Sequence, residues 1–120
     1  MEAIRTGGRM TFDPKDFEEV AAICTSLVED AGDHAGVLEY SYWANDARDA
    51  IIVREHYESA AAMLRHIELL DPVAIGRLLE LVEPQPARCA AADTPANRDA
   101  LAALAALGVV VDLYTPVALG

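Results

Sequence analysis

The alternation of apolar and polar residues changes period along the chain, and each period predicts a type of element. Strands are expected over 4–12, 37–43 and 50–57, and the polar connector 44–49 makes the last two a hairpin. Between the first two strands, apolar residues at helical spacing predict a helix over 14–30. The apolar face of this helix comprises Phe17, Val20, Ala21, Cys24, Leu27 and Val28.

Cap residues and prolines divide the second half of the chain into further elements. Ser59 is a good N-cap for a helix, and the Asp-Pro and Thr-Pro pairs at 71–72 and 94–95 give two more start signals. Gly108 ends the last helix, and Pro116 ends the last strand. We therefore expect helices over 60–70, 72–82 and 96–107 and strands over 87–92 and 109–115.

The resulting order of elements is β-α-β-β-α-α-β-α-β. Its first six or seven elements match the split βαβ plan of a ferredoxin-like α+β fold, and the last helix and strand are additions. The chain has 120 residues, with no internal repeat and no low-complexity linker. We therefore expect a single domain over 1–120.

The formal net charge of −11 narrows the range of partners. Phosphate backbones and anionic lipids repel such a chain, so we expect no nucleic-acid and no membrane partner. The N-terminus has no apolar region of the kind that a signal peptide needs. Cys24 and Cys89 form no Cys-x-x-Cys pair, so neither a disulfide framework nor a metal site is expected, and a cytoplasmic location is the simplest interpretation.

Three stretches together resemble the antibiotic biosynthesis monooxygenase family of dimeric α+β barrels. They are GGRMTFDPKDFEEVAAICTSLVEDA, AGVLEYSYW and REHYESAAAMLRHIELL, and the tail NRDALAALAALGVVVDLYTPVALG resembles a C-terminal extension of some members. The resemblance implies two helices on a four-stranded sheet, a homodimer in which two sheets meet face to face, and a pocket between sheet and helices in each subunit. Characterised relatives oxygenate phenolic or quinol compounds with O2 and without flavin, haem or metal, so no cofactor is expected.

The sequence departs from the family pattern at Tyr57 and after His66, where residues 67–72 (IELLDP) replace the usual short polar stretch. Tyr57 stands where many relatives carry Trp. Haem-degrading members use an Asn, a Trp and a His, and this chain has no matching Asn on the first strand and no Trp on the helix. The lack of that Asn and that Trp disfavours haem degradation.

His66 and Tyr57 are the candidate catalytic residues. Oxygenation without a cofactor needs a base or hydrogen-bond donor that favours the ionised substrate, and histidine is the usual base near neutral pH. His66 lies at the edge of the apolar helix face, beside Met63, so we expect it to point toward the sheet. Tyr57 would act as a phenol donor if the helices cover its side of the strand. The alternatives are a packed His66 bonded to a backbone carbonyl and a Tyr57 that is an ordinary core residue.

The candidate substrate-binding residues lie mainly on two strands and follow from strand alternation. Tyr40 and Tyr42 share one face, and Trp43 takes the other with Val37 and Glu39. Each aromatic residue could equally be core or dimer interface. The full set is Tyr40, Tyr42, Trp43, Glu55, His56 and Met63.

The roles of two members of this set stay open. Glu55 shares a face with Tyr57 and could fix a pocket histidine, or it could bridge to an arginine across the dimer. His56 lies with Ile52 and Arg54, so it could instead face solvent or the dimer partner.

Three functions remain open at this level. The first is a cofactor-independent monooxygenase that oxidises a small phenolic, quinol or polyketide-like aromatic. The second is a non-catalytic small-molecule-binding or stress-response dimer on the same fold. The third is an interaction module whose pocket is filled by its own side chains. The first requires that His66 point inward, into a space large enough for a flat guest.

Overall fold

The strands of the computed structural model, which describes residues 3–120, form one sheet. They are β1 (Ile4–Thr11), β2 (Val37–Ala44), β3 (Ala50–Tyr57), β4 (Glu83–Pro84), β5 (Ala87–Ala90) and β6 (Val111–Tyr114). The order is β2-β3-β1-β5-β6, with antiparallel neighbours except for the parallel pair β5 and β6, and β4 pairs with β1. The first four strands of this order form the split βαβ arrangement, so the ferredoxin-like α+β fold is confirmed.

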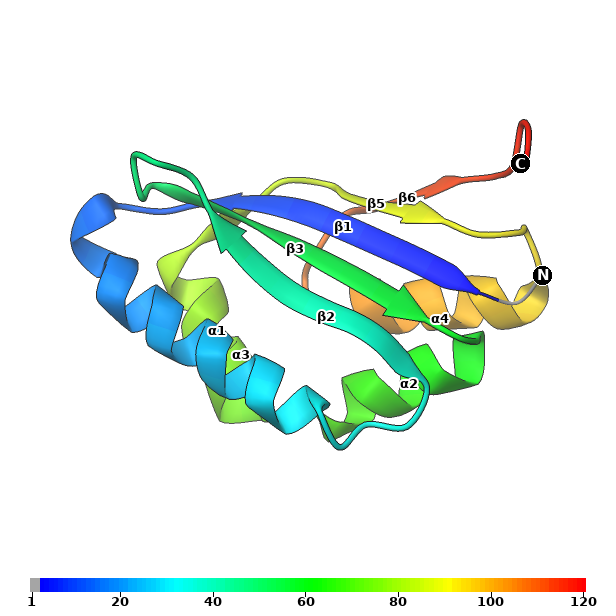
Figure 1. Ribbon diagram of the computed structural model, residues 1–120, viewed down its shortest axis with the longest axis horizontal. Helices are drawn as coiled ribbons and strands as arrows, with labels where there is room; N and C mark the ends of the chain where they lie inside the picture. The colour runs from blue at the N-terminus through cyan, green and yellow to red at the C-terminus, as the bar shows by residue number, and fades with distance from the viewer. Residues whose placement is uncertain (1–2) are drawn as a thin grey trace.

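The helices cover one face of the sheet, and the opposite face carries no helix among the described residues (Figure 1). The short 3-10 helix η1 (Pro14–Asp16) precedes α1 (Phe17–Ala31). The other helices are α2 (Ala60–Leu69), α3 (Pro72–Leu81) and α4 (Pro95–Ala105). The side chains of Ser59, Asp71 and Thr94 accept hydrogen bonds from N–H groups of the first turns, which confirms these predicted helix starts.

The observed elements depart from the predicted ones mainly at their ends. The first turn of the predicted helix 14–30 is a separate 3-10 turn, because the Asp13 side chain caps Lys15 N–H and the chain enters the α-helix only at Phe17. Short β4 was not predicted, because Pro84 interrupts any strand pattern there. The strand predicted over 87–92 ends two residues earlier, at Ala90, and the strand predicted over 109–115 is shortened to Val111–Tyr114.

A β-bulge in β2 changes which of its residues face the helices. The register shifts between Val37 and Glu39, so that Val37 pairs with Tyr57 and Leu38 is the extra residue. Val37 therefore packs into the interior and Leu38 is exposed. The prediction that Val37 shares a face with Trp43 is wrong, because it assumed unbroken alternation.

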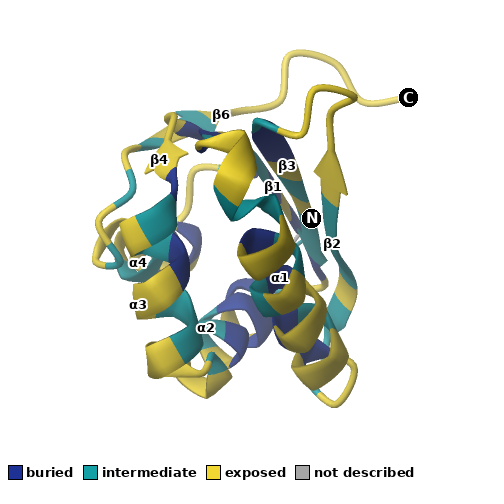
Figure 2. Cartoon of the chain, turned by 90° about the vertical axis from the view of Figure 1, so that its left-hand side faces the viewer, coloured by how far each residue is buried: buried dark blue, intermediate teal, exposed yellow. Residues whose placement is uncertain are grey.

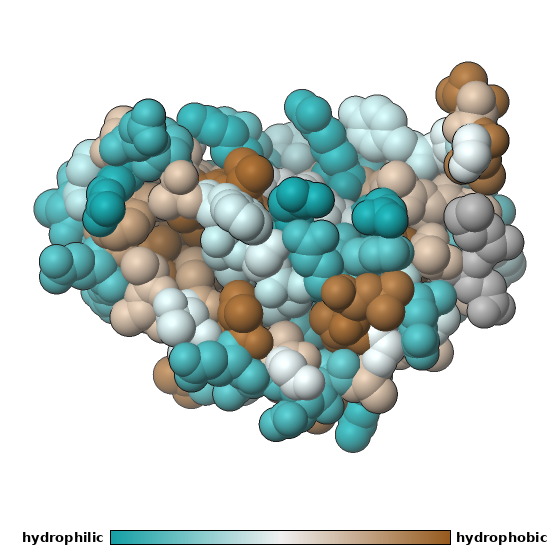
Figure 3. All heavy atoms as spheres, in the orientation of Figure 1, coloured by the Kyte–Doolittle hydropathy of each residue, from teal (hydrophilic) through white to brown (hydrophobic). Residues whose placement is uncertain are grey.

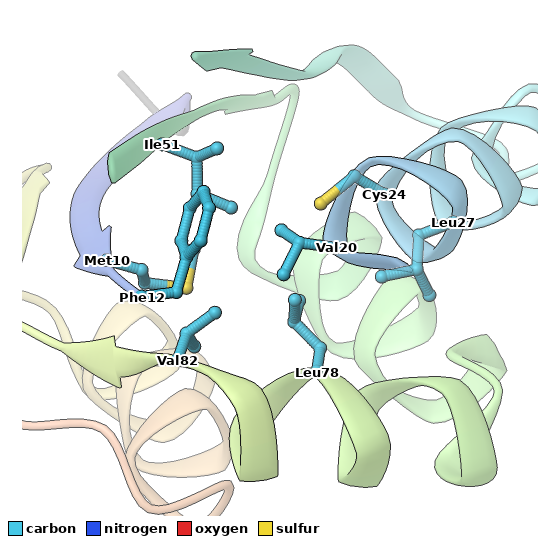
Figure 4. Close-up of a cluster of buried hydrophobic side chains, with 8 residues drawn as sticks. All are labelled: Met10, Phe12, Val20, Cys24, Leu27, Ile51, Leu78 and Val82. Atoms are coloured by element: carbon cyan, nitrogen blue, oxygen red, sulfur yellow. The ribbon is translucent and has the colours of Figure 1, made fainter. Parts of the chain in front are cut away.

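The core between sheet and helices consists of two clusters of buried side chains. In the first, Met10, Phe12 and Ile51 from the sheet side point toward α1 and the end of α3 (Figure 4). In the second, Ile4, Tyr57 and Met63 pack with several alanines of α2 and α4. Small side chains let α2 and α4 approach closely, which explains how an alanine-rich chain builds a core. Figure 2 shows the buried residues on the inner sides of the helices and the exposed ones outside.

The exposed apolar residues include a C-terminal segment that leaves the body of the molecule after β6. Val117 and Leu119 are both exposed, and this end projects at the upper right of Figure 3. The segment therefore adds little to the core. Among the described residues, no helix has the length and apolar character needed to cross a bilayer.

The turn between α1 and β2 depends on one glycine. Gly36 has a φ of +78°, and its carbonyl accepts a 2.9 Å hydrogen bond from the N–H of Glu58. A Cβ at this position would lie 2.6 Å from the Cβ of Ala62 on α2. Both the backbone angle and the close approach therefore require glycine.

We expect Gly36→Ala to lower the free energy of unfolding by about 2 kcal/mol or more, because it adds left-handed strain and a clash. Urea unfolding followed by circular dichroism measures this change. Gly76→Ala in α3 is the matched control, because its Cβ would meet nothing within 4 Å. Helix propensity should make the control equal to or up to ~1 kcal/mol more stable than the parent. Equal effects of the two substitutions would contradict this account of the turn.

Candidate active site

A cavity of about 80 Å³ lies between the helix-covered face of the sheet and helices α3 and α4, and we call it the central cavity. Its apolar wall includes Val53, Leu78 and Leu79. Its half-buried polar side chains come from two neighbouring strands, with Tyr40 and Tyr42 on β2 and Glu55 on β3. Strand alternation places all three on one face, because Tyr40 pairs with Glu55 and Tyr42 with Val53. The cavity is thus apolar with one polar end.

The two tyrosines form a hydrogen-bonded pair. Their hydroxyl oxygens lie 2.7 Å apart and their ring centroids 5.4 Å apart. Burial is the main cause that raises the pKa of both phenols, so both are neutral near pH 7. Each hydroxyl has one proton, so the mutual bond uses one and leaves one O–H free to donate. The pair can therefore donate a hydrogen bond to a polar atom in the central cavity.

Glu55 holds a buried carboxyl group at the same end. Thr6 Oγ1 donates a 2.7 Å hydrogen bond to Oε2, and the Tyr57 hydroxyl donates to Oε1. Thr6 lies opposite Glu55 in the β1–β3 register, and Tyr57 follows two residues later on the same face. Burial raises the pKa of Glu55, and the two hydrogen bonds oppose that rise. The carboxyl can therefore exchange a proton closer to neutral pH than an exposed glutamate.

His66 points inward, as predicted from its place on the helix. Only 1% of its surface is exposed. Its ring centroid lies 4.5 Å from that of Tyr40 and 5.5 Å from that of Tyr57. Its Nδ1 lies 2.7 Å from Nδ1 of His34, and its Nε2 is buried without a hydrogen-bond partner among residues 3–120. Burial, and then the neighbouring His34, lower the pKa of His66 to about 4.

The imidazole of His66 nevertheless does not line the central cavity. Tyr40 contributes to the cavity wall and also contacts His66, so the histidine lies behind the tyrosine. The central cavity is therefore not the open space that was expected directly beside His66, because the Tyr40 and Tyr57 rings pack against the imidazole. A catalytic role for His66 and Tyr57 stays a prediction.

The other predicted site residues fall on different surfaces. Trp43 is 57% exposed on the helix-free face, where its indole N–H donates to Ser41 Oγ at 2.9 Å. His56 lies on the same face, opposite Arg5 and Glu39 in the two neighbouring strands. Met63 is fully buried in the second core cluster. A guest in the central cavity would therefore contact Tyr40, Tyr42 and Glu55 but not Trp43 or His56.

Sequence reasoning missed His34 and Gly8 as site residues. His34 lies in the turn 32–36, where no hydrophobic periodicity indicates which way a side chain points. The one sequence signal there was a histidine two residues before the turn glycine Gly36. Gly8 lines the central cavity from β1, and its missing side chain leaves room there. Within residues 3–120, no three His, Cys, Asp or Glu side chains are grouped closely enough to hold a metal ion.

The comparisons with known proteins agree with this geometry. The family model for antibiotic biosynthesis monooxygenase matches residues 3–69, more than half of the chain, and no curated protein matches. The crystal structure of MupZ from Pseudomonas fluorescens aligns over 100% of this chain and 96% of its own, with 16% identity and a TM-score of 0.73. The added helix and strand therefore also have counterparts in a solved structure.

Two further structures are described as proposed antibiotic biosynthesis monooxygenases. The one from Bacteroides thetaiotaomicron VPI-5482 aligns over 70% of this chain and 84% of its own, with 23% identity and a TM-score of 0.62. The one from Chloroflexus aurantiacus J-10-fl aligns over 72% and 89%, with 23% identity and a TM-score of 0.59. Identities at this level show a shared fold.

The depressed pKa of His66 predicts an acid-sensitive stability. The unfolded chain accepts a proton near the ordinary histidine pKa of 6.5, whereas the folded protein resists it until about 4. The contribution of neutral, buried His66 to the free energy of unfolding is therefore present above about pH 6.5 and is lost as the pH falls toward 4. Relative to His66→Phe, the parent should lose about 2 kcal/mol between pH 7 and pH 5, measured by urea unfolding. His56→Gln is the control and should lose as much unfolding free energy between pH 7 and pH 5 as the parent does. A His66→Phe variant that also loses as much as the parent would show that His66 is not the source of the acid sensitivity.

Proposed function

The chain belongs to the antibiotic biosynthesis monooxygenase family, and from that premise we propose that it is a cofactor-independent monooxygenase. Its substrate would be a small phenolic, quinol or polyketide-like aromatic, oxidised by O2 in the central cavity. Because the Tyr40 and Tyr57 rings pack against His66, the proposal is carried not by that histidine but by the polar end of the central cavity, where the tyrosine pair and the Glu55 carboxyl meet apolar walls. That arrangement suits a flat ring with one ionisable oxygen.

The reaction needs only groups that the substrate and this cavity supply. An acidic O–H or C–H proton leaves the substrate, and the resulting electron-rich anion adds O2 at carbon. For an anthrone, the hydroperoxide formed at the methylene carbon then loses water and leaves a carbonyl group, so atoms and electrons balance without an external reductant. Apolar walls favour this chemistry because they keep water away from the anion and the hydroperoxide.

The tyrosine pair and Glu55 divide the work in this proposal. The free O–H of the Tyr40–Tyr42 pair donates to the developing oxyanion, which lowers the cost of ionising the substrate. Glu55 exchanges the proton, because its raised pKa brings it closer to the working pH. Tyr57 holds Glu55 in place through its hydroxyl.

A non-catalytic binding role on the same fold is the second candidate, and its ligand would occupy the same central cavity. A cavity of about 80 Å³ is roughly half the ~150 Å³ that accommodates benzene in an engineered protein core. A flat substrate therefore requires side chains such as Leu79 and Leu104 to move aside. Ligand binding without oxygen uptake would identify this second role.

Aerobic incubation with a panel of quinols and anthrones, followed by an oxygen electrode, tests the enzyme. We expect uptake above the autoxidation blank, a loss of about tenfold or more in kcat for Tyr42→Phe, and a loss of about 100-fold for Glu55→Gln. Gly8→Val should abolish turnover by filling the cavity, since its side chain would project there.

Glu68→Gln is the matched control for Glu55→Gln, because Glu68 is an exposed carboxylate on α2 paired with Arg65. It should keep parental activity. Uptake no faster than the blank for every substrate, or equal rates for Glu55→Gln and Glu68→Gln, would overturn the proposed mechanism.

We further propose that two copies of the chain associate through the helix-free face of the sheet. Trp43, Ile52 and Tyr114 are large exposed side chains on that face. Apolar residues on an uncovered sheet face are typical of an interface. The facing sheets would complete the dimeric barrel that the family resemblance implies.

Ile52→Glu should convert a dimer into a monomer, because it places a charge in the centre of the proposed interface. Analytical ultracentrifugation across a concentration series measures the change. Val73→Glu is the matched control, since Val73 is an exposed valine on α3, away from the sheet. A monomeric parent, or a dimer that survives Ile52→Glu unchanged, would contradict this assembly.

A further inference from the structure

We propose that His34 and His66 form a two-imidazole proton relay between solvent and the polar end of the central cavity. In this relay His34 is a positioning and transfer residue that acts through His66, and it does not touch substrate. The inference rests on the proposed function for its purpose, because a monooxygenase of this kind must remove a proton from its substrate and return one to the hydroperoxide. Its geometry stands independently of any substrate.

The contact between the two imidazoles defines the relay. Nδ1 of His34 and Nδ1 of His66 lie 2.7 Å apart, and the ring planes meet at 61°. Two nitrogens at this distance share one proton, because two N–H groups or two lone pairs would repel. His66 is buried and His34 is half-buried. The pair therefore spans from the interior to the surface.

Backbone hydrogen bonds hold His34 at the outer end. Its N–H donates to the carbonyl of Ala31 at 3.0 Å, and its carbonyl accepts from the N–H of Val37 at 3.4 Å. Gly36 closes the same turn with its positive φ. These backbone hydrogen bonds and the positive φ of Gly36 fix the position of His34 in the turn, so its side chain can be held against His66.

The inner end of the relay is the Nε2 atom of His66. This nitrogen is buried and has no partner among the described residues. The rings around His66 are those of Tyr40, which lines the central cavity, and Tyr57, which bonds to Glu55. A buried polar nitrogen without a partner is costly, and this unused nitrogen is the atom that would receive a proton from the cavity side.

The cost of burying an N–H group without an acceptor also decides which of the two histidines carries the shared proton. If His34 donates to His66, then Nε2 of His66 carries an N–H that has nothing to bond. If His66 donates to His34, then Nε2 of His66 is a lone pair, and the N–H moves to Nε2 of His34, where water can accept it. We therefore assign the proton to Nδ1 of His66 in the resting state, because orphaned buried N–H groups are rare.

The transfer balances without any net change in the pair's charge. One proton reaches Nε2 of His66 from the cavity end through one water, because His66 does not itself line the central cavity. The Nδ1 proton of His66 passes to Nδ1 of His34, and the Nε2 proton of His34 passes to solvent. The reverse sequence returns a proton to the cavity. The titratable groups nearest the relay are the phenols of Tyr40 and Tyr57, with Glu55 behind Tyr57.

Nitrogen-15 NMR of the histidine rings in the parent protein at pH 7 tests the resting assignment without any substrate. We expect His66 with a protonated Nδ1 and a bare Nε2, and an Nδ1 proton shifted by its bond to His34. A bare Nδ1 and a protonated Nε2 on His66 would overturn the relay. This measurement holds even if no oxygenase substrate is found.

Kinetics of His34 variants test the transfer. His34→Gln can keep a hydrogen bond to His66 but cannot carry a proton, and His34→Ala leaves a gap open to solvent. Both should lower kcat about tenfold or more with little change in KM, and added imidazole should restore His34→Ala but not His34→Gln. Arg65→Gln, exposed on α2 beside His66, is the control that should match the parent.

The two proposals fail in different ways. If the parent shows no oxygen uptake with any substrate, the proposed function fails, and the NMR assignment still decides the relay. If the parent is active and His34→Gln is equally active, the relay fails and the oxygenase stands. A His34→Ala variant that is folded by circular dichroism, slow, and unmoved by imidazole also contradicts the relay.

Discussion

The interior of this protein depends on one buried carboxyl group, that of Glu55. An ionised carboxylate under the sheet would cost several kcal/mol without partners. Thr6 and Tyr57 supply hydrogen bonds to both of its oxygens. These donors are in place because the β1–β3 register sets Thr6 opposite Glu55 and strand alternation puts Tyr57 on the same face. The register that folds the sheet therefore also builds the polar end of the central cavity.

The same alternation puts the cavity on one face of the sheet and the proposed association surface on the other. Side chains on the helix-covered face form the core, the central cavity and the tyrosine pair. Side chains on the helix-free face include Trp43, Ile52 and Arg54, and they are available for association. A family member of this fold can therefore change its cavity chemistry without changing its assembly, because alternate residues of one strand serve the two purposes.

The sequence was sufficient for the order of the elements other than η1 and β4, and for most residue faces, because hydrophobic period and cap residues are local signals. The Tyr40, Tyr42 and Glu55 cluster follows from alternation once the hairpin is placed. Three features were out of reach. The bulge at Leu38 breaks alternation with no marker in the sequence, the contact of His34 with His66 joins segments far apart in the chain, and the position of Tyr40 between His66 and the cavity depends on side-chain packing.

The proposed function depends on a substrate held at the polar end of the central cavity. A crystal structure of the protein with a non-oxidisable phenolic analogue, grown without oxygen, tests it most directly. We expect the ring between the sheet and α3, with the phenol oxygen within hydrogen-bonding distance of the Tyr40 or Tyr42 hydroxyl. A ring bound against Trp43 on the helix-free face, with the central cavity unchanged, would contradict it.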